Sequence, residues 1–332
     1  MNFSHFNKVV FAASLLATGF SYADSDRPLL SLSVSQSGGT ALNSEGSLDT
    51  RTPASQSRVL PIWGDEARAR GYDLPEPFGV SYNYMNLRQD VIVDKIGFSA
   101  EKALGQRILS NIIIDVGHTR SSNESHMLKL DSWVFPFMNV YGLYGKTKGS
   151  STAQLNSVGS KTDSLVSNVP FDLDYEGKTY GAGFTLAGGY NQFFGTFDLN
   201  YTKTNLDILD GDIKALVITP RVGYEFVFQP LIAGQGNTKL QVWTGAMYQD
   251  ITQRFKGDVS KLSLPNELDE LMNNPLAGAI MGNIKFDVEQ HLAHKWNNTI
   301  GARLEVTRNF NIITEVGFNN RNSFLFSGEF RF

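Results

Sequence analysis

Ten charged residues stand at alternating positions of several short segments, and they are the residues whose type and spacing could do chemistry. Six are acidic and four are basic: Lys129, Asp131, Asp198, Arg221, Glu225, Arg303, Glu305, Glu315, Glu329 and Arg331. Residues two apart in a strand point to the same face, so each segment would present its charges on one side. Inside a barrel, the set could be a pore lining that selects ions or a salt-bridge network that fills a narrow lumen. The interleaved signs favour the network.

A second group combines serine with histidine. His118 and His126 flank Ser121, Ser122 and Ser125, and a serine beside a histidine can act as nucleophile and general base in a hydrolase. Both residue types are also ordinary in loops, and no motif of such enzymes surrounds them. We therefore predict no catalytic residue, and we keep a lipid- or peptide-hydrolysing enzyme as the least favoured alternative.

The remaining histidines raise the question of a metal site. His291 and His294, together with Glu289, have a spacing that could place two ligands on one helical turn. The sequence fixes no third ligand, and the chain has no cysteine. We therefore expect neither a bound metal nor a cofactor.

Composition excludes several classes of protein. The 332 residues carry a formal charge of −4 and are 12% aromatic and 19% charged, with 31 glycines. Disordered chains are poor in aromatic residues, and nucleic-acid-binding chains normally need a basic face, so neither class fits. The lack of cysteine excludes a disulfide scaffold. Abundant glycine and phenylalanine together suit a transmembrane barrel.

Residues 1–23 have the features of a secretory signal peptide. Lys8 supplies a positive charge, an apolar run follows from Val9 to Phe20, and Ser21-Tyr22-Ala23 offers small residues where a signal peptidase reads them. The run of about 12 residues is too short for a membrane span, which needs about 20. We expect cleavage before Asp24, and no later stretch is long and apolar enough for a transmembrane helix.

Two further segments precede the first expected strand. Residues 24–60 are rich in Ser, Gly and Thr and are predicted to be a flexible linker. In residues 61–77, Asp65 can cap a short helix that Gly71 ends and that Pro75 and Pro77 cannot continue. This helix could dock on the barrel or plug its mouth, where Trp63, Arg68, Arg70 and Tyr72 would meet inward acids.

From Phe78 onward the apolar residues alternate with polar or small ones. At the C-terminus, Phe324, Phe326, Phe330 and Phe332 share one face, whereas Ser327, Glu329 and Arg331 share the other. A soluble β-sandwich also alternates, but its strands are often shorter and its buried face is aliphatic. Long strands flanked by aromatic residues, with tight turns on one side and long excursions over 150–176 and 257–283, favour a lipid-facing barrel over residues 78–332.

The last residues, FSGEFRF, resemble the C-terminal strand of Gram-negative outer-membrane β-barrel proteins. The segments WGDEARARGYDLPEPFGVSYNY, WVFPFMNVYGLYG and GAGFTLAGGY are also similar to a family of such barrels without an assigned activity, which extends the resemblance over residues 62–332. The resemblance implies a location in the outer membrane of a Gram-negative bacterium and contact with its lipid. It also implies recognition by the outer-membrane assembly machinery, with Phe326, Phe330 and Phe332 as the assembly signal.

The fold prediction is an all-β, antiparallel, up-and-down transmembrane barrel of about ten strands with a short N-terminal helix. The expected strands are 78–93, 118–135, 138–149, 177–190, 193–206, 213–228, 238–256, 298–308, 309–319 and 323–332. Segment 99–116 is the least certain, because a strand at Leu109–Val116 paired with another at 284–291 would raise the count to twelve.

Three functions stay open at this point. The first is a non-enzymatic barrel that passes or binds a small or amphiphilic solute. The second is a sealed structural or surface-interaction barrel that acts through its extracellular loops. The third is the hydrolase already mentioned. The sequence does not identify a small-molecule ligand.

Overall fold

The computed structural model describes residues 59–69, 72, 74–111, 113–159, 164–207, 211–232, 237–259 and 283–332. The signal peptide expected over residues 1–23 and nearly all of the linker expected over 24–60 lie outside these described residues. No helix among them has the length and apolar character needed to cross a membrane.

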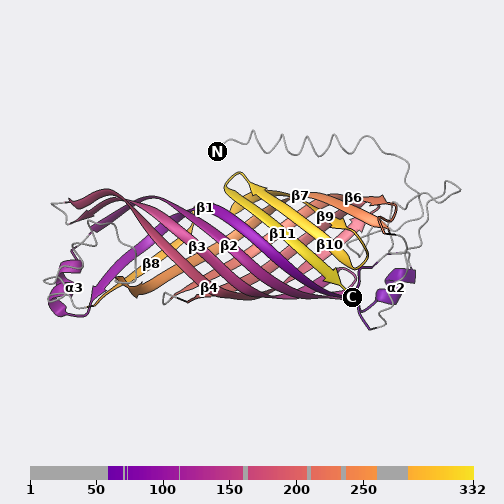
Figure 1. Cartoon of the computed structure of the whole chain (residues 1–332), viewed down its shortest axis with the longest axis horizontal. Helices are drawn as coiled ribbons and strands as arrows, with labels where there is room; N and C mark the ends of the chain where they lie inside the picture. The colour runs from indigo at the N-terminus through magenta and orange to yellow at the C-terminus, as the bar shows by residue number, and fades with distance from the viewer. Residues whose placement is uncertain are drawn as a thin grey trace.

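The described chain is almost entirely antiparallel β-sheet, and Figure 1 shows its strands as one long tilted barrel. Two short helices accompany them, α2 (Gly64–Ala69) and α3 (Ala103–Leu109). The strands are β1 (Phe78–Ala100), β2 (Ile113–Phe135), β3 (Met138–Gly159), β4 (Ser164–Tyr190), β5 (Phe193–Leu206), β6 (Asp212–Phe228), β7 (Thr238–Asp258), β8 (Ile284–Leu292), β9 (Trp296–Glu305), β10 (Phe310–Phe318) and β11 (Arg321–Arg331).

The sheet closes on itself because β11 pairs with β1. Neighbouring strands follow the chain order, except that β8 lies between β7 and β1 while β9 lies between β7 and β10. Both β8 and β9 run antiparallel to β7, and only residues 293–295 separate them. Together they therefore pass along the barrel wall once, as a single interrupted strand. The eleven strands therefore make ten passes, an even number that lets every neighbouring pair stay antiparallel.

The predicted fold class is confirmed, with differences in detail. The expected excursion over 150–176 is mostly strand, because β3 continues to Gly159 and β4 begins at Ser164. Of the two extra strands in the twelve-strand alternative, one forms and the other does not. Its strand near 284–291 forms as β8, but Leu109 ends α3 and residues from Ile113 belong to β2. The polar outward face of β3, with Lys148, Thr152 and Gln154, hid the alternation of Ala153 and Leu155, which point inward and are buried.

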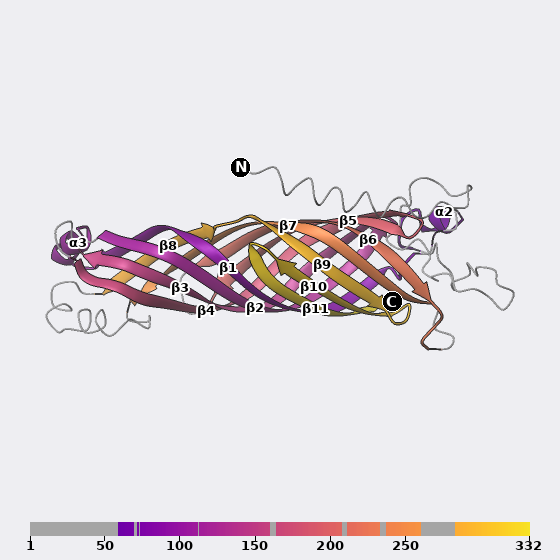
Figure 2. The same cartoon turned by 90° about the horizontal axis from the view of Figure 1, so that it is seen from above.

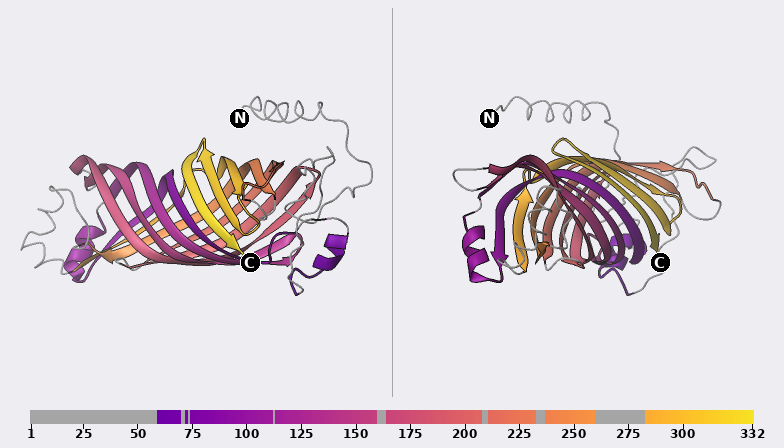
Figure 3. Two further views of the ribbon diagram at one scale, coloured as in Figure 1. Left: turned by 45° about the vertical axis from the view of Figure 1, so that its right-hand side comes forward. Right: turned by 60° about the vertical axis from the view of Figure 1, so that its left-hand side comes forward.

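The barrel has two halves of different width. The half that holds Phe78 and Phe332, here called the C-terminal rim half, contains β1–β7, β9, β10 and β11. The β10–β11 hairpin turns back where Arg321 pairs with Gln89 of β1, and immediately beyond it Val91 of β1 pairs with Leu292 of β8. From there toward α3, β8 takes the place of β9, β10 and β11, so the ring narrows from ten strands to eight, and β5 and β6 in turn end at Leu206 and Asp212. Figures 2 and 3 show α3 and α2 at opposite ends.

The outward face is apolar over the rim half. Large apolar side chains are exposed there, among them Leu130, Tyr144, Phe193, Tyr201, Val222, Ile300, Phe326 and Phe332. The opposite face of the same strands carries buried polar residues, such as Thr219, Glu225, Gln241 and Thr299. A barrel that is apolar outside and polar inside is inverted relative to a soluble protein, and it is the arrangement of a transmembrane β-barrel.

Main-chain hydrogen bonds to Phe332 complete the seam that closes the barrel. The Phe332 N–H donates to the Phe78 carbonyl over 2.9 Å, and the Phe78 N–H donates to the Phe332 carbonyl over 3.0 Å. Deleting Phe332 removes both bonds at the closing strand, so we expect the amount of assembled barrel in the membrane to fall at least several-fold. Quantifying the fraction that migrates differently before and after boiling in gels measures this. Phe318→Ala, a similarly exposed ring on β10, is the control that should assemble normally. Equal assembly of the deletion variant and wild type would contradict the prediction.

Candidate functional site

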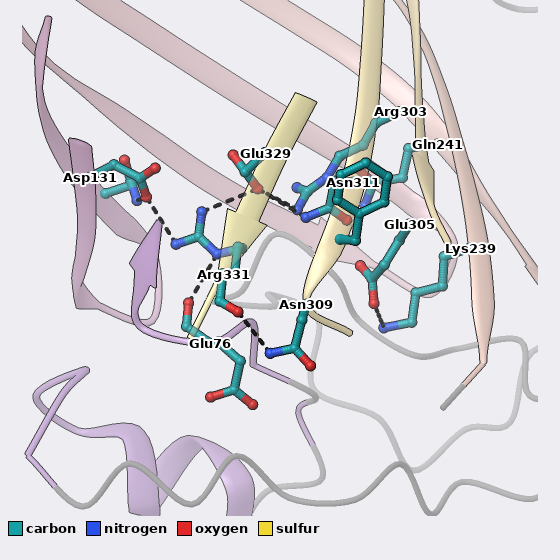
Figure 4. Close-up of polar contacts among 12 residues, drawn as sticks. Glu76, Asp131, Lys239, Gln241, Arg303, Glu305, Asn309, Asn311, Glu329 and Arg331 are labelled. Carbon is teal, nitrogen blue, oxygen red and sulfur yellow. Dashed lines mark hydrogen bonds and ion pairs between the residues drawn. The ribbon is translucent and has the colours of Figure 1, made fainter. Parts of the chain in front are cut away.

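The lumen is the candidate site, and it begins at the C-terminal rim with a cluster of five charges from β2, β9 and β11. Figure 4 labels Asp131, Arg303, Glu329 and Arg331 of this cluster. Arg331 donates through Nη2 to Asp131 Oδ1 over 2.9 Å and lies 3.2 Å from Glu329 Oε1. Arg303 Nη2 donates to the same Glu329 oxygen over 3.2 Å, and Lys129 Nζ lies 3.7 Å from Asp131 Oδ2. Three bases thus surround two acids, and the side chains of Asp131, Glu329 and Arg331 are almost fully buried.

A second ion pair joins β6 to β10 further along the lumen. The Arg221 guanidinium donates to both oxygens of the Glu315 carboxylate, with Nε–Oε2 and Nη2–Oε1 distances of 2.6 and 3.0 Å. The indole Nε1 of Trp243 on β7 donates to Glu315 Oε2 over 2.7 Å. A bidentate pair with a third donor is strong and directional, so it fixes the position of three strands relative to one another.

The remaining predicted charges also lie inside. Asp198 Oδ2 accepts hydrogen bonds from the Tyr141 hydroxyl over 2.8 Å and from Thr185 Oγ1 over 2.7 Å. Glu225 Oε2 accepts from Gln241 Nε2 over 2.7 Å, and Glu305 Oε1 lies 3.7 Å from Lys239 Nζ. Each of the eight residues proposed as a lumen network therefore has an ionic or hydrogen-bonded partner on another strand, which is the arrangement expected of a filled lumen and not of free pore charges.

Uncharged hydroxyls line the next level of the lumen. Ser125, Thr147, Thr179 and Thr204 come from β2, β3, β4 and β5, and successive hydroxyls are 3.0, 2.8 and 2.7 Å apart. The alternation of β3 places Lys146 and Lys148 on the opposite, exposed face. Going away from the rim, the lining thus changes from charged to hydroxyl-bearing.

Side chains from distant strands meet across the eight-stranded half. The ring of Tyr175 on β4 lies 5.1 Å from the ring of Phe255 on β7, centroid to centroid. The Tyr175 hydroxyl contacts Ser121 of β2 over 3.3 Å and also donates to Asn123. Gln290 of β8 donates to Gln253 of β7 and contacts Ser151 of β3 at 3.5 Å. We call Ser121, Ser151, Tyr175, Gln253, Phe255 and Gln290 the bridging layer.

Around and beyond the bridging layer the interior is apolar. A buried cluster contains Val91, Leu173, Ile213, Ile251, Val259, Phe286, Val288 and Leu292 together with Tyr175 and Phe255 of the bridging layer. Phe255 has no exposed surface. An eight-stranded barrel has an interior just wide enough for side chains to fill, and the narrowing from ten strands to eight occurs where this apolar core begins.

The serine and histidine residues do not form a hydrolase pair among the described residues. Ser121 is buried and faces the lumen, whereas His126 faces outward, where its Nδ1 lies 2.6 Å from the Tyr82 hydroxyl and its Nε2 lies 3.2 Å from Glu124. His118 Nε2 contacts Asp90 over 3.3 Å. His291 Nδ1 contacts Asp94 over 2.7 Å, and no group of three potential metal ligands occurs in the part of the chain that the structure describes.

The bridging layer was not singled out by sequence reasoning, although part of its pattern is visible. Gln249, Ile251, Gln253 and Phe255 alternate with outward polar residues, so amides and apolar side chains share the inward face of β7. This mixture departs from the polar-in, apolar-out rule of the rim half. It marks a segment of β7 whose outward side chains lie outside the lipid layer and whose inward side chains pack into an apolar core.

The segment 61–77 docks on the C-terminal rim. Arg308, in the β9–β10 turn, donates to Glu76 Oε1 and to the Leu74 carbonyl, each over 2.7 Å. Arg331 Nε donates to the Glu76 carbonyl over 2.9 Å. The Trp63 ring packs 5.1 Å from that of Phe135, and Arg68 pairs with Asp65. Arg70 lies outside the described residues, so insertion of this segment into the lumen stays a prediction.

Removal of residues 24–76 is expected to weaken the barrel without opening it. The deletion takes away the acceptors of Arg308 and one acceptor of Arg331, and each charge-assisted bond contributes about 1.5–3 kcal/mol. The bridging layer lies in the other half and keeps all its contacts. We expect a lower urea midpoint in detergent, and an ion current in planar bilayers that matches the full-length protein. A large current appearing only after the deletion would show that the segment, and not the bridging layer, closes the lumen.

Comparisons with known proteins found distant likenesses among solved structures. No protein-family model and no curated protein matches the chain. Among solved structures, the transport unit of the autotransporter AIDA-I from Escherichia coli has a TM-score of 0.35 at 8% identity, covering 76% of this chain and 89% of that one. The β-domain of the Bordetella autotransporter BrkA has a TM-score of 0.30 at 10% identity, covering 77% and 100%. The Ralstonia pickettii toluene transporter TbuX has a TM-score of 0.26 at 11% identity, covering 78% and 90%.

These likenesses are low in TM-score and in sequence identity, so the class of this protein rests on its own fold. The closed antiparallel ring with its apolar outer and polar inner faces defines the class as a transmembrane β-barrel.

Proposed function

We propose that this protein is a non-enzymatic outer-membrane barrel of a Gram-negative bacterium whose lumen is sealed by its own side chains, and which works through its outer surface and loops. The observation that carries the proposal is the bridging layer. Tyr175–Phe255 joins β4 to β7, and Ser151–Gln290 joins β3 to β8. The Ser151–Gln290 contact connects walls that are three strands apart, and the Tyr175–Phe255 contact connects β4 to β7 just past the ends of β5 and β6, at Leu206 and Asp212, which leaves little bore between them.

Placement in the outer membrane is supported by strand dimensions. On β4 the outward face is apolar or glycine from Tyr180 to Tyr190, and on β5 from Phe193 to Tyr201, lengths of 11 and 9 residues. A transmembrane strand needs about 9–11 residues. Tight connections at the C-terminal rim, such as the one between Tyr190 and Phe193, favour the periplasm for that rim, because periplasmic turns are short in this class. The α3 end then faces outward, and assembly would need the outer-membrane assembly machinery.

Solute uptake tests the proposal. Liposomes that contain the full-length mature protein are expected not to swell in an iso-osmotic arabinose solution, while liposomes with an open general porin swell within seconds to minutes. Folding is verified beforehand by the change of gel mobility on boiling. Swelling at a rate comparable to that of the porin, from protein shown to be folded, would contradict the sealed lumen.

The change of lining along the lumen favours a second candidate, the binding of a small amphiphilic solute. Charged residues occupy the rim half, hydroxyls follow, and the apolar cluster lies beyond, so a polar head and an apolar tail would find matching surroundings. The test is fluorescence of the apolar dye 1-N-phenylnaphthylamine with the reconstituted barrel. Saturable enhancement that disappears on replacing Phe286 with a polar residue would favour binding, and enhancement equal to that of protein-free liposomes would exclude it.

A further inference from the structure

The outward face of four adjacent strands changes abruptly from apolar to basic. On the side of the C-terminal rim the outward face is apolar. Going away from that rim along β3, β4, β5 and β6, the apolar stretch ends at Tyr144, Tyr180, Tyr201 and Leu216. Two residues further along each strand, the next outward residues are all lysines: Lys146, Lys178, Lys203 and Lys214. Two residues along a strand is about 7 Å, so each lysine lies directly above an apolar or tyrosine side chain.

Tyrosines at this boundary locate the edge of the hydrocarbon layer. Tyr144, Tyr180 and Tyr201 are 60%, 43% and 49% exposed, and outward tyrosines gather at the level of lipid headgroups because one end of the ring is apolar and the other polar. The lysines above them therefore lie at the height of the headgroups. In the orientation proposed above, this is the outer leaflet.

The lysines are continuous across the strands. Lys146 of β3 pairs in register with Lys178 of β4, and Lys203 of β5 pairs in register with Lys214 of β6. The two pairs are separated by two strand spacings across the sheet and by two residues along the strands, because Lys203 pairs in register with Tyr180, so they lie about 12 Å apart. Lys148 adds a fifth positive charge next to the first pair. We call Lys146, Lys148, Lys178, Lys203 and Lys214 the lysine row.

Acidic neighbours neutralise only part of the lysine row. Glu176 lies 3.9 Å from Lys146 and 3.2 Å from Lys148, and Asp212 lies 3.2 Å from Lys203 and 3.4 Å from Lys214. Burial opposes the ionisation of Asp212, but its hydrogen bonds to Lys203 and Lys214 and the charge of Lys214 outweigh it and hold its pKa below the usual value. Two carboxylates thus form ion pairs with four lysines, and Lys178 has no ion pair among the described residues.

We propose that the lysine row binds the phosphate groups of an anionic, diphosphorylated glycolipid in the leaflet next to the α3 end, while the tyrosines contact its acyl chains. Five positive charges lie on an exposed surface at headgroup height, and only two carboxylates are ion-paired with them. Two basic pairs about 12 Å apart suit a headgroup with two phosphates better than a single-phosphate lipid. The inference rests on the outer-membrane orientation of the proposed function, but it does not need a sealed lumen.

Titration of the full-length mature barrel in detergent with lipid A, followed by native mass spectrometry, tests the site. The test variant is the triple substitution Lys146→Gln, Lys178→Gln, Lys203→Gln. The matched control removes the same charge from β1, β7 and β8 with Lys95→Gln, Lys256→Gln and Lys285→Gln. Each lysine near an anionic lipid surface adds to the binding free energy. Losing three of them should therefore weaken lipid A binding roughly 100-fold. The control should stay within about threefold of wild type, and phosphatidylcholine binding should change in neither variant.

Every other result overturns the proposal. Equal weakening of the test and control variants would show general charge attraction without a site, and unchanged binding of the test variant would show that the lysines do not contact the lipid. If the triple glutamine variant does not fold, two further variants test whether the lysine row binds lipid A. Replacing the same three lysines by arginine must retain lipid A binding, and Lys178→Glu must weaken it at least tenfold. Failure of either result contradicts the site, whatever the swelling assay shows of the lumen.

Discussion

Replacing Glu315 with alanine is expected to destabilise the folded barrel by about 3–5 kcal/mol, because the change leaves the Arg221 guanidinium and the Trp243 indole N–H without their acceptor inside the lumen. The Glu315 side chain is 4% exposed, and it receives three hydrogen bonds from β6 and β7. Truncating one partner of a buried pair costs more than removing both. The double variant Arg221→Ala, Glu315→Ala should therefore recover part of the loss.

Urea unfolding in detergent micelles, followed by gel mobility without boiling, measures this effect. Glu176→Ala is the matched control, because Glu176 also pairs with two cations but on the outer surface, where such pairs contribute about 0.2–1 kcal/mol. A Glu315→Ala loss no larger than that of Glu176→Ala would show that the lumen around Arg221 is wide and hydrated, which is contrary to a filled interior.

Removing both rings of the bridging layer should produce the second large effect. The double variant Tyr175→Ala, Phe255→Ala deletes the contact that joins β4 to β7 and creates a cavity where Phe255 had no exposed surface. A buried Phe→Ala change alone costs about 3–5 kcal/mol. In variant protein that still folds, ion passage should appear where wild type shows none, since the polar rim half would then connect with the α3 end.

Two controls keep this result interpretable. Phe255→Leu retains an apolar side chain of similar size, so it should lose less stability and stay closed. Phe226→Ala removes an exposed outward ring from β6 and should leave both stability and ion passage nearly unchanged. If the double variant folds and passes no ions, the apolar cluster beyond the bridging layer, and not the layer itself, closes the lumen.

The fold of the rim half could be predicted from the sequence because the physics there is simple. Lipid outside and polar contacts inside impose a strict period of two, and the alternation at Phe324 to Phe332 or Tyr180 to Tyr190 shows it directly. The same rule predicted eight lumen residues, and each of them has an ionic or hydrogen-bonded partner on another strand. Their partners could not be predicted, since Arg221 and Glu315 are 94 residues apart and meet only through the barrel's closure.

The prediction of strand boundaries from the sequence failed where the strands extend beyond the membrane. Past Lys146 and Glu176 the outward face meets water, so charged and serine residues replace apolar ones and the segment looks like a loop. The inward face becomes apolar at the same time, as with Leu155 and Leu173. The interruption at residues 293–295 was equally hidden, because it depends on a hairpin, β10–β11, that ends short of its neighbours.

The steady ion current through the full-length mature protein in a planar lipid bilayer tests the sealed lumen most directly. The protein is reconstituted after its heat-dependent gel shift shows that it is folded, and its insertion is confirmed by protease protection of the same preparation. The sealed arrangement of Tyr175, Phe255, Gln253 and Gln290 predicts a current at the baseline of the protein-free bilayer, and discrete steps only for Tyr175→Ala, Phe255→Ala. Large, stable, ohmic steps from the wild-type protein would contradict it.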